Sequence, residues 1–333
     1  MKRSSLLKIA AGIGIAGLGI YMFTRLGELP QMAHEIRNTP YWKIIIVVLC
    51  NPGTLFFRAL RWRYLLPDKR MCSKKKLFPL VVIGFMVNDV TFFRIGEVVR
   101  AGLLWKRNKF TVAESVGSII VERAIDSIGF VIMLIIPIFT LEKLAVLKPY
   151  GVLFSVGVGM VFVMLLLYLL FPGMIKKTGA GAAGFLPHKI RKPIVKITGE
   201  IFSNLDWIYS LKKVVGVILL TLATLACQVV MVGVLGWGIP DFTWMVSVYE
   251  IALAAVGAAI PLSPGYVGTL HTAMMSGVNM LELPADKAGA VVILYHALGY
   301  ITIVAMGFFF FIRLKISFKD LKIINKDVAS SSD

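Results

Sequence analysis

The amino-acid sequence predicts an all-α, polytopic membrane protein with about six full transmembrane helices and two re-entrant helical hairpins. Of its 333 residues, 58% are hydrophobic and only 16% are charged, against about 25% charged residues in soluble domains. Apolar runs long enough to cross a hydrocarbon core of about 30 Å recur along the chain. Because these runs are continuously apolar and do not alternate, they indicate helices and not a barrel.

The first two predicted spans are residues 6–23 and 44–57. Basic residues flank the start of the first span, and no convincing signal-peptide cleavage site follows it. Residues 58–76 contain eight lysines and arginines, which places this segment in the cytoplasm by the positive-inside rule. A second basic cluster, residues 94–109, lies beyond the next apolar run.

One full crossing between these two basic clusters would put one of them outside the cell. A re-entrant hairpin removes this conflict: residues 77–87 enter from the cytoplasm, residues 88–96 form an irregular tip, and residues 97–105 lead out again. Non-helical backbone at this depth is tolerated only where protein or a wet cavity covers it.

Two further spans and a basic segment follow. Residues 115–140 cross outward and residues 151–171 return. The segment 172–213 is strongly basic and is therefore expected in the cytoplasm. Apolar residues at helical spacing between positions 194 and 208 predict an amphipathic helix on the membrane surface within it, and a partner-binding helix is the alternative.

The C-terminal part mirrors this arrangement. Residues 214–237 cross outward, residues 246–280 are apolar but interrupted by prolines and glycines, and residues 288–312 cross inward. The interruption predicts a second hairpin, which enters from outside. We expect one transmembrane domain over 1–313, a basic flexible tail over 314–333, and both termini in the cytoplasm. Two broken segments from opposite faces are typical of inverted-repeat transporters, and eight straight crossings are the alternative.

Ionisable side chains concentrate in VNDVTFFRIGEVVRAGLL (87–104) and ESVGSIIVERAIDSIGF (114–130). A charge at membrane depth costs about 2.5–3.5 kcal/mol unless it is paired or hydrated. Glu122 and Asp126 share a helix face, so Arg94 or Arg100 can pair with them. Such pairs either pin the hairpin or bind substrate. The candidate binding residues in these stretches are Asn88, Asp89, Arg94, Glu97, Arg100, Glu122, Arg123 and Asp126.

The third notable stretch is AAIPLSPGYVGTLHTAMM (258–275). A helix that begins after this turn would direct free N–H groups and a positive dipole end into the membrane, which suits an anionic headgroup. A tight turn without a ligand is the simpler interpretation. The candidate residues are Ser263, Gly265 and His271. The sequence contains no visible metal-ligand cluster, and we expect neither a metal nor a cofactor.

The motifs TFFRIGEVVRAGLL, VERAIDSIGF, RALRWRYLL and PLSPGYVG resemble the lysylphosphatidylglycerol synthase transmembrane (flippase-like) family over nearly the whole chain. The family includes proteins that move aminoacylated phosphatidylglycerol between leaflets. This chain resembles the stand-alone members without the cytoplasmic aminoacyl-transfer domain, so lipid synthesis is not expected. It departs from the family at His271, where an acidic residue is common, and at Tyr266, where a glycine is common. The resemblance therefore does not specify the substrate.

We therefore expect a lipid or lipid-linked substrate translocator that binds an anionic or zwitterionic headgroup between the hairpins. Its expected location is the cytoplasmic (inner) membrane of a bacterial-type cell, and a homo-oligomer is left open. Membrane lipids explain the net charge of +18 without a nucleic-acid partner. Catalytic motifs are not visible, so an enzyme is not expected. The alternatives are a membrane enzyme acting on a lipid, with Glu97 or Asp126 as its base, and a non-catalytic scaffold.

Overall fold

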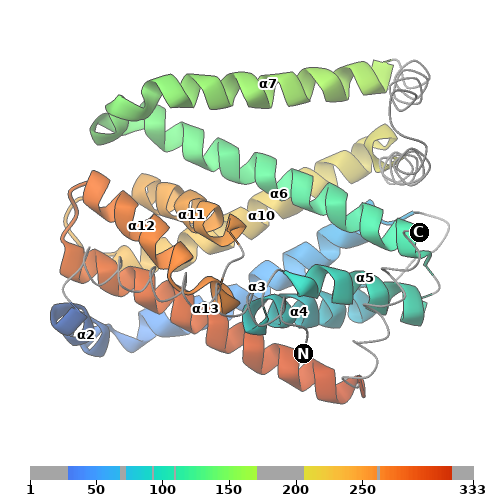
Figure 1. The fold of residues 1–333 in the computed structure, drawn as a ribbon, viewed down its shortest axis with the longest axis horizontal. Helices are drawn as coiled ribbons and strands as arrows, with labels where there is room; N and C mark the ends of the chain where they lie inside the picture. The colour runs from blue at the N-terminus through green and yellow to red at the C-terminus, as the bar shows by residue number, and fades with distance from the viewer. Residues whose placement is uncertain are drawn as a thin grey trace, which may run out of the picture.

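The computed structural model describes residues 29–67, 73–91, 94–108, 110–170, 206–260 and 263–316, and the regular secondary structure in these ranges is helical throughout (Figure 1). Three predictions fall on other residues. The span 6–23, most of the basic segment 172–213 with its surface helix, and nearly all of the tail lie outside the described residues.

Five long helices correspond to the five remaining predicted spans. They are α3 (Tyr41–Leu65), α6 (Val112–Thr140), α7 (Lys148–Leu170), α10 (Leu211–Gly236) and α13 (Ala285–Arg313). In Figure 1 all five run between the left and right ends of the molecule. Within the described residues, four segments are long and apolar enough to cross a membrane: Tyr41–Leu65, Glu142–Met160, Leu211–Gly236 and Ala285–Arg313. Helix α6 is not among them and carries Glu122, Arg123 and Asp126 along its length.

The first hairpin consists of α4 (Lys74–Val90) and α5 (Ile95–Asn108), which pack against each other. Its break is shorter than predicted, because Asn88 and Asp89 still belong to the last turn of α4. The Asn88 side-chain oxygen accepts a hydrogen bond of 2.8 Å from the Gly96 amide and so closes the tip. A side chain at Gly96 would overlap the Gly84 carbonyl oxygen, so the close approach of the two helices requires glycine there.

The second hairpin consists of α11 (Trp244–Ala259) and α12 (Thr269–Met280), joined through the short 3₁₀ helix η5 (Pro264–Tyr266). The break falls where prolines and glycines predict it. Gly265 and Gly268 have φ angles of 60° and 89°, which are readily available to glycine. Gly257 and Gly277 lie on the facing sides of α11 and α12, where a Cβ would stand 2.6 Å from the Thr269 carbonyl oxygen and 2.5 Å from Glu250 Oε1.

The two hairpins are attached to opposite ends of the bundle, as Figure 1 shows. At the end of α5, the Arg107 side chain donates a hydrogen bond of 2.7 Å to the Leu314 carbonyl just after α13. At the other end, Lys143 in the 3₁₀ helix η2 (Glu142–Leu147) donates one of 2.9 Å to the Leu281 carbonyl just after α12. This arrangement fits hairpins that enter a membrane from opposite faces, and re-entrance itself stays a prediction.

The prediction that α3 ends before Arg58 was wrong. The helix continues to Leu65, and Arg58, Arg61 and Trp62 lie buried on its inner face. The two arginines do not belong to an exposed loop, because a carboxylate on α6 pairs with them inside the bundle. Helix α2 (Leu29–Asn38) was not predicted at all, and its Met32 packs over Gly289 of α13.

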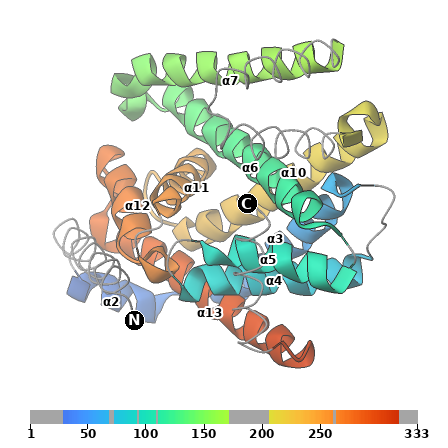
Figure 2. The same ribbon diagram turned by 45° about the vertical axis from the view of Figure 1, so that its right-hand side comes forward.

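Two buried apolar clusters support the hairpins. One joins α4 and α5 to α3 and α13, and the other joins α11 and α12 to α6, α10 and α13. Helix α7 contacts chiefly α6 and η2 and lies at the edge of the bundle in both ribbon views (Figures 1 and 2). The two clusters therefore leave the region between the hairpin tips to polar side chains.

Candidate functional site

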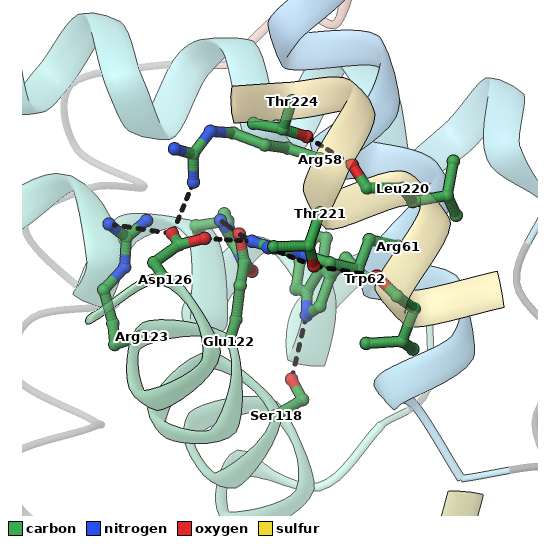
Figure 3. Close-up of polar contacts among 12 residues, drawn as sticks. Arg58, Arg61, Trp62, Ser118, Glu122, Arg123, Asp126, Leu220, Thr221 and Thr224 are labelled. Atoms are coloured by element: carbon green, nitrogen blue, oxygen red, sulfur yellow. Dashed lines mark hydrogen bonds and ion pairs between the residues drawn. The ribbon is translucent and has the colours of Figure 1, made fainter. Parts of the chain in front are cut away.

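Asp126 of α6 is held by two arginines of α3 (Figure 3). Its carboxylate oxygens accept hydrogen bonds of 2.5 Å from Arg58 Nη1 and 2.6 Å from Arg61 Nη2, and all three side chains are buried. Arg61 also donates to Thr221 Oγ1 of α10 at 3.1 Å and lies 3.5 Å from Glu122 Oε1. The three helices α3, α6 and α10 are thus joined by charge-assisted contacts, which are stronger than neutral hydrogen bonds.

Arg100 of the first hairpin pairs with Glu122 of α6, and both side chains are buried. The Arg100 guanidinium lies 4.0 Å from the centre of the Trp62 ring, and Trp62 Nε1 donates a hydrogen bond of 2.9 Å to Ser118 Oγ. The predicted pairing of Arg100 with an acid on α6 is therefore present. Because neither Arg100 nor Glu122 lines the cavity described next, their pair fastens the hairpin to the bundle.

A cavity of about 260 Å³ lies between the two hairpin tips and the long helices. Its walls come from both hairpins and from α3, α6, α10 and α13. Six of the predicted site residues line it: Asn88, Asp89, Arg94, Glu97, Arg123 and Asp126. Further polar side chains of the wall are Asn51, Thr54, Arg58, Ser127, Gln228, Tyr266, Tyr295, His296 and Tyr300.

The two tips touch each other through Arg94. Its Nη2 donates a hydrogen bond of 2.7 Å to the Ala258 carbonyl, and its guanidinium lies 5.7 Å from the centre of the Tyr266 ring. Of the two arginines predicted as partners for α6, Arg100 makes the contact, whereas the tip places Arg94 against the second hairpin. Arg94 and Tyr266 have φ angles of 51° and 59°, a conformation that costs of order 1–3 kcal/mol and that clusters at functional sites.

The second charged pair of the wall is Glu97 with Arg123, whose Oε1 and Nε are 3.3 Å apart. Each side chain is 26% exposed, in contrast to the sealed Arg100–Glu122 pair. Arg123 also lies 3.7 Å from Asp126 Oδ2. Exposed ion pairs contribute little to stability, so this pair can exchange partners more readily than the buried ones.

Some buried polar atoms of the wall lack a partner. In the described ranges, Arg94 Nε and Gln228 Oε1 are buried and make no hydrogen bond. Buried polar groups nearly always have a partner in native proteins, and the exceptions call for a water, an ion or a ligand. Both side chains line the cavity, which indicates that a polar ligand or water belongs there.

Ser263, Gly265 and His271 do not line the cavity but shape the tip of the second hairpin. The Ser263 hydroxyl donates a hydrogen bond of 2.7 Å to the Val267 carbonyl. His271 Nδ1 accepts one of 3.3 Å from the Gly268 amide, and its Nε2 lies 3.2 Å from Nδ1 of His296. A histidine side chain thus caps the start of α12.

Sequence reasoning missed Arg58 and Arg61 as site residues. The signal was present, because they are three residues apart on one helix face and no helix breaker separates them from the preceding span. Gln228 and Tyr300 gave no such signal, since isolated polar residues in apolar helices are common. In the part of the chain that the structure describes, no group of three or more histidines, cysteines or carboxylates is arranged to hold a metal.

Comparison with known proteins gives two matches. The family described as the lysylphosphatidylglycerol synthase transmembrane region matches residues 7–307. A UPF0104 membrane protein of Methanocaldococcus jannaschii is 24% identical over 234 residues, which cover 66% of this chain and 91% of that protein. The family match spans most of the chain and includes both hairpins and every residue of the cavity wall. The chain is therefore a multi-pass helical membrane protein that belongs to the lysylphosphatidylglycerol synthase transmembrane family.

Proposed function

We propose that this protein translocates a lipid or lipid-linked substrate and holds its anionic or zwitterionic headgroup in the cavity between the hairpin tips. The observation that carries the proposal is the wall itself, where Arg94, Arg123 and Arg58 face Glu97 and Asp126 around partly unsatisfied polar groups. Intramembrane charges of this kind mark substrate pathways by default. The family match agrees with a membrane role of this type.

The cavity volume of about 260 Å³ suits a small headgroup. A phosphate with a small polar substituent fits this space. We infer that the chains stay in the surrounding lipid while the headgroup passes between the tips.

Arg94 is the residue proposed to contact the headgroup phosphate. Its partners include a backbone carbonyl and a ring face, and its Nε has no hydrogen-bond partner in the described part of the chain. A phosphate offers several acceptor oxygens to a guanidinium, so it would be a better partner than the Ala258 carbonyl. Binding would thus loosen the contact between the two tips.

The proposal includes the placement in the membrane. The hairpins enter from opposite faces, and the basic ends of α5 and α13 lie in the cytoplasm, as do both termini. The shared location of Arg107 and Leu314 at one end of the bundle supports this orientation. The cytoplasmic membrane of a bacterial-type cell is the proposed location.

The test is reconstitution of the purified protein into liposomes with a fluorescent anionic phospholipid in both leaflets. Dithionite quenching then measures how fast lipid crosses. Wild type should accelerate crossing, and Arg94→Gln should lower the rate by at least about tenfold, since a hydrogen bond to a charged group is worth about 1.5–3 kcal/mol. Arg37→Gln, which removes an exposed arginine of α2, is the matched control and should retain the rate.

Two results would refute the proposal: wild-type vesicles that match protein-free liposomes, or an Arg94→Gln rate equal to wild type. The enzyme alternative is tested on the same vesicles. Recovered lipids of unchanged mass favour translocation, whereas a covalent product favours a reaction in which Glu97 or Asp126 acts as a base.

A further inference from the structure

Glu250 of α11 is a buried carboxyl outside the cavity wall. Its side chain is 1% exposed, and in the described ranges neither of its oxygens has a hydrogen-bond partner. None of the arginine–carboxylate pairs includes it. Glu250 therefore needs an explanation separate from the charged network around Asp126.

The carboxyl lies in the seam between the two helices of the second hairpin. A Cβ at Gly277 of α12 would stand 2.5 Å from Glu250 Oε1, so the glycine makes the room that the carboxyl occupies. The buried apolar residues of α11 and α12 form one cluster with residues of α6, α10 and α13. An ionised carboxylate without a partner in such surroundings costs far more than a neutral carboxyl, because the charge itself has to be desolvated.

The position of Glu250 relates it to the cavity. Ala254, which lines the cavity, is one helical turn away on the same face of α11, a rise of about 6 Å. On α12, Leu270 lines the cavity, and Gly277 lies two turns farther along on the same face. The seam therefore continues from the cavity past Glu250 toward the end of the bundle where Lys143 meets Leu281.

The ionisable groups on neighbouring elements are engaged elsewhere. Tyr249 donates to Met280 Sδ, and His271 lies at the hairpin tip beside His296. On α6, Arg123 pairs with Glu97 of the first hairpin, and Asp126 pairs with Arg58 and Arg61 of α3. Groups more distant along these elements are Lys212 and Lys213 at the start of α10, Glu114 at the start of α6, Glu122 beside Arg100, and the exposed Asp241 and Glu282 at the hairpin ends.

We propose that Glu250 is a proton-binding site: it holds a proton while α11 and α12 are packed together and releases it when the seam opens to water. Proton release and hairpin opening are then linked, because each favours the other by the same free energy. If the proposed translocation holds, this seam is the route between the cavity and the outer end, and its opening releases one proton, which is taken up again when the seam closes. The proton site itself does not depend on lipid movement.

Two measurements on the full chain in nanodiscs test the site. Infrared spectroscopy should show a protonated-carboxyl band that Glu250→Gln removes. Hydrogen exchange should show protection factors of α11 and α12 amides that fall with rising pH, by up to about tenfold per pH unit for one linked proton. Glu250→Gln mimics the protonated form, so its protection factors should be flat with pH. Amides of α13 serve as the internal reference.

Several results would overturn the proposal. An unchanged infrared band in Glu250→Gln would show that Glu250 is ionised, and pH-independent protection in wild type would show no linkage, whether or not the variant folds. A pH slope that persists in Glu250→Gln, or in the apolar second variant Glu250→Met, would assign the proton to another group such as His271. None of these results bears on lipid translocation, so the two proposals fail separately.

Discussion

Substitution of Asp126 by asparagine removes the charge that holds Arg58 and Arg61 together. Breaking a buried ion pair from one side costs about 3–5 kcal/mol, because the remaining charge is left buried without compensation. Arg61 keeps its contacts with Thr221 at 3.1 Å and Glu122 at 3.5 Å, whereas Arg58 loses its 2.5 Å carboxylate contact. We therefore expect a loss near the lower limit, about 3 kcal/mol.

The assay is reversible unfolding in mixed micelles with increasing dodecyl sulfate, followed by far-ultraviolet circular dichroism. Asp126→Asn should unfold at lower denaturant than wild type. In an Arg58→Met background the same change should cost at least about 1 kcal/mol less, since contacting residues couple by about 0.5–3 kcal/mol. Glu142→Gln, on the exposed helix η2, is the control and should stay within about 0.5 kcal/mol of wild type. A loss below 1 kcal/mol for Asp126→Asn, with additive double variants, would refute the reasoning.

Two further changes test the packing of the first hairpin. Gly96→Ala should destabilise the protein by about 3 kcal/mol in the same unfolding assay, because the new Cβ would overlap the Gly84 carbonyl. The control is Gly157→Ala, in open space on α7, which should be neutral or stabilising by up to about 1 kcal/mol. Equal effects of the two substitutions would contradict the predicted clash. Trp62→Phe should cost about 1–2 kcal/mol through loss of the hydrogen bond to Ser118 and weaker stacking on the neighbouring guanidinium, and a neutral result would show that this contact is dispensable.

Most of the helix pattern could be predicted from the sequence because it follows from local properties. Apolar runs locate α6, α7, α10 and α13 to within a few residues at most ends, and prolines and glycines locate the break of the second hairpin. The first hairpin has no such break, and only the conflict between two basic clusters indicated it. Charge counting thus located a feature that hydropathy alone would have drawn as a single crossing.

The same charge counting explains the main error. Arg58 and Arg61 were assigned to a loop because arginine is expensive in a membrane when it has no partner. Their partner, Asp126, is 65 and 68 residues away in sequence, so its proximity is a tertiary fact. The partner of Arg94 could not be predicted for a related reason. The register of the hairpin tip decides whether Arg94 faces α6 or the second hairpin, and no local sequence pattern encodes that register.

The charged residues around the cavity differ in how deeply their ion pairs are buried, and this difference bears on the charge of the ligand that the cavity would bind. Arg100 and Glu122 are buried in the helix packing away from the cavity, Arg58, Arg61 and Asp126 are buried at or next to its wall, and Glu97 and Arg123 are each 26% exposed. With Arg94 and Asp89 included, five arginines oppose four carboxylates in this described region.

An excess of one positive charge in a buried space favours an anionic guest, because Coulomb attraction is stronger inside a protein than in bulk water. The excess positive charge is not spread evenly over the arginines, because Arg100 is paired with Glu122, and Arg58 and Arg61 are paired with Asp126. Arg94 is the arginine whose contact is to a backbone carbonyl and not to a carboxylate. A phosphate that reaches the cavity would therefore bind most strongly to Arg94, at the contact between the two hairpin tips. Phosphate binding and separation of the tips would then both depend on this side chain.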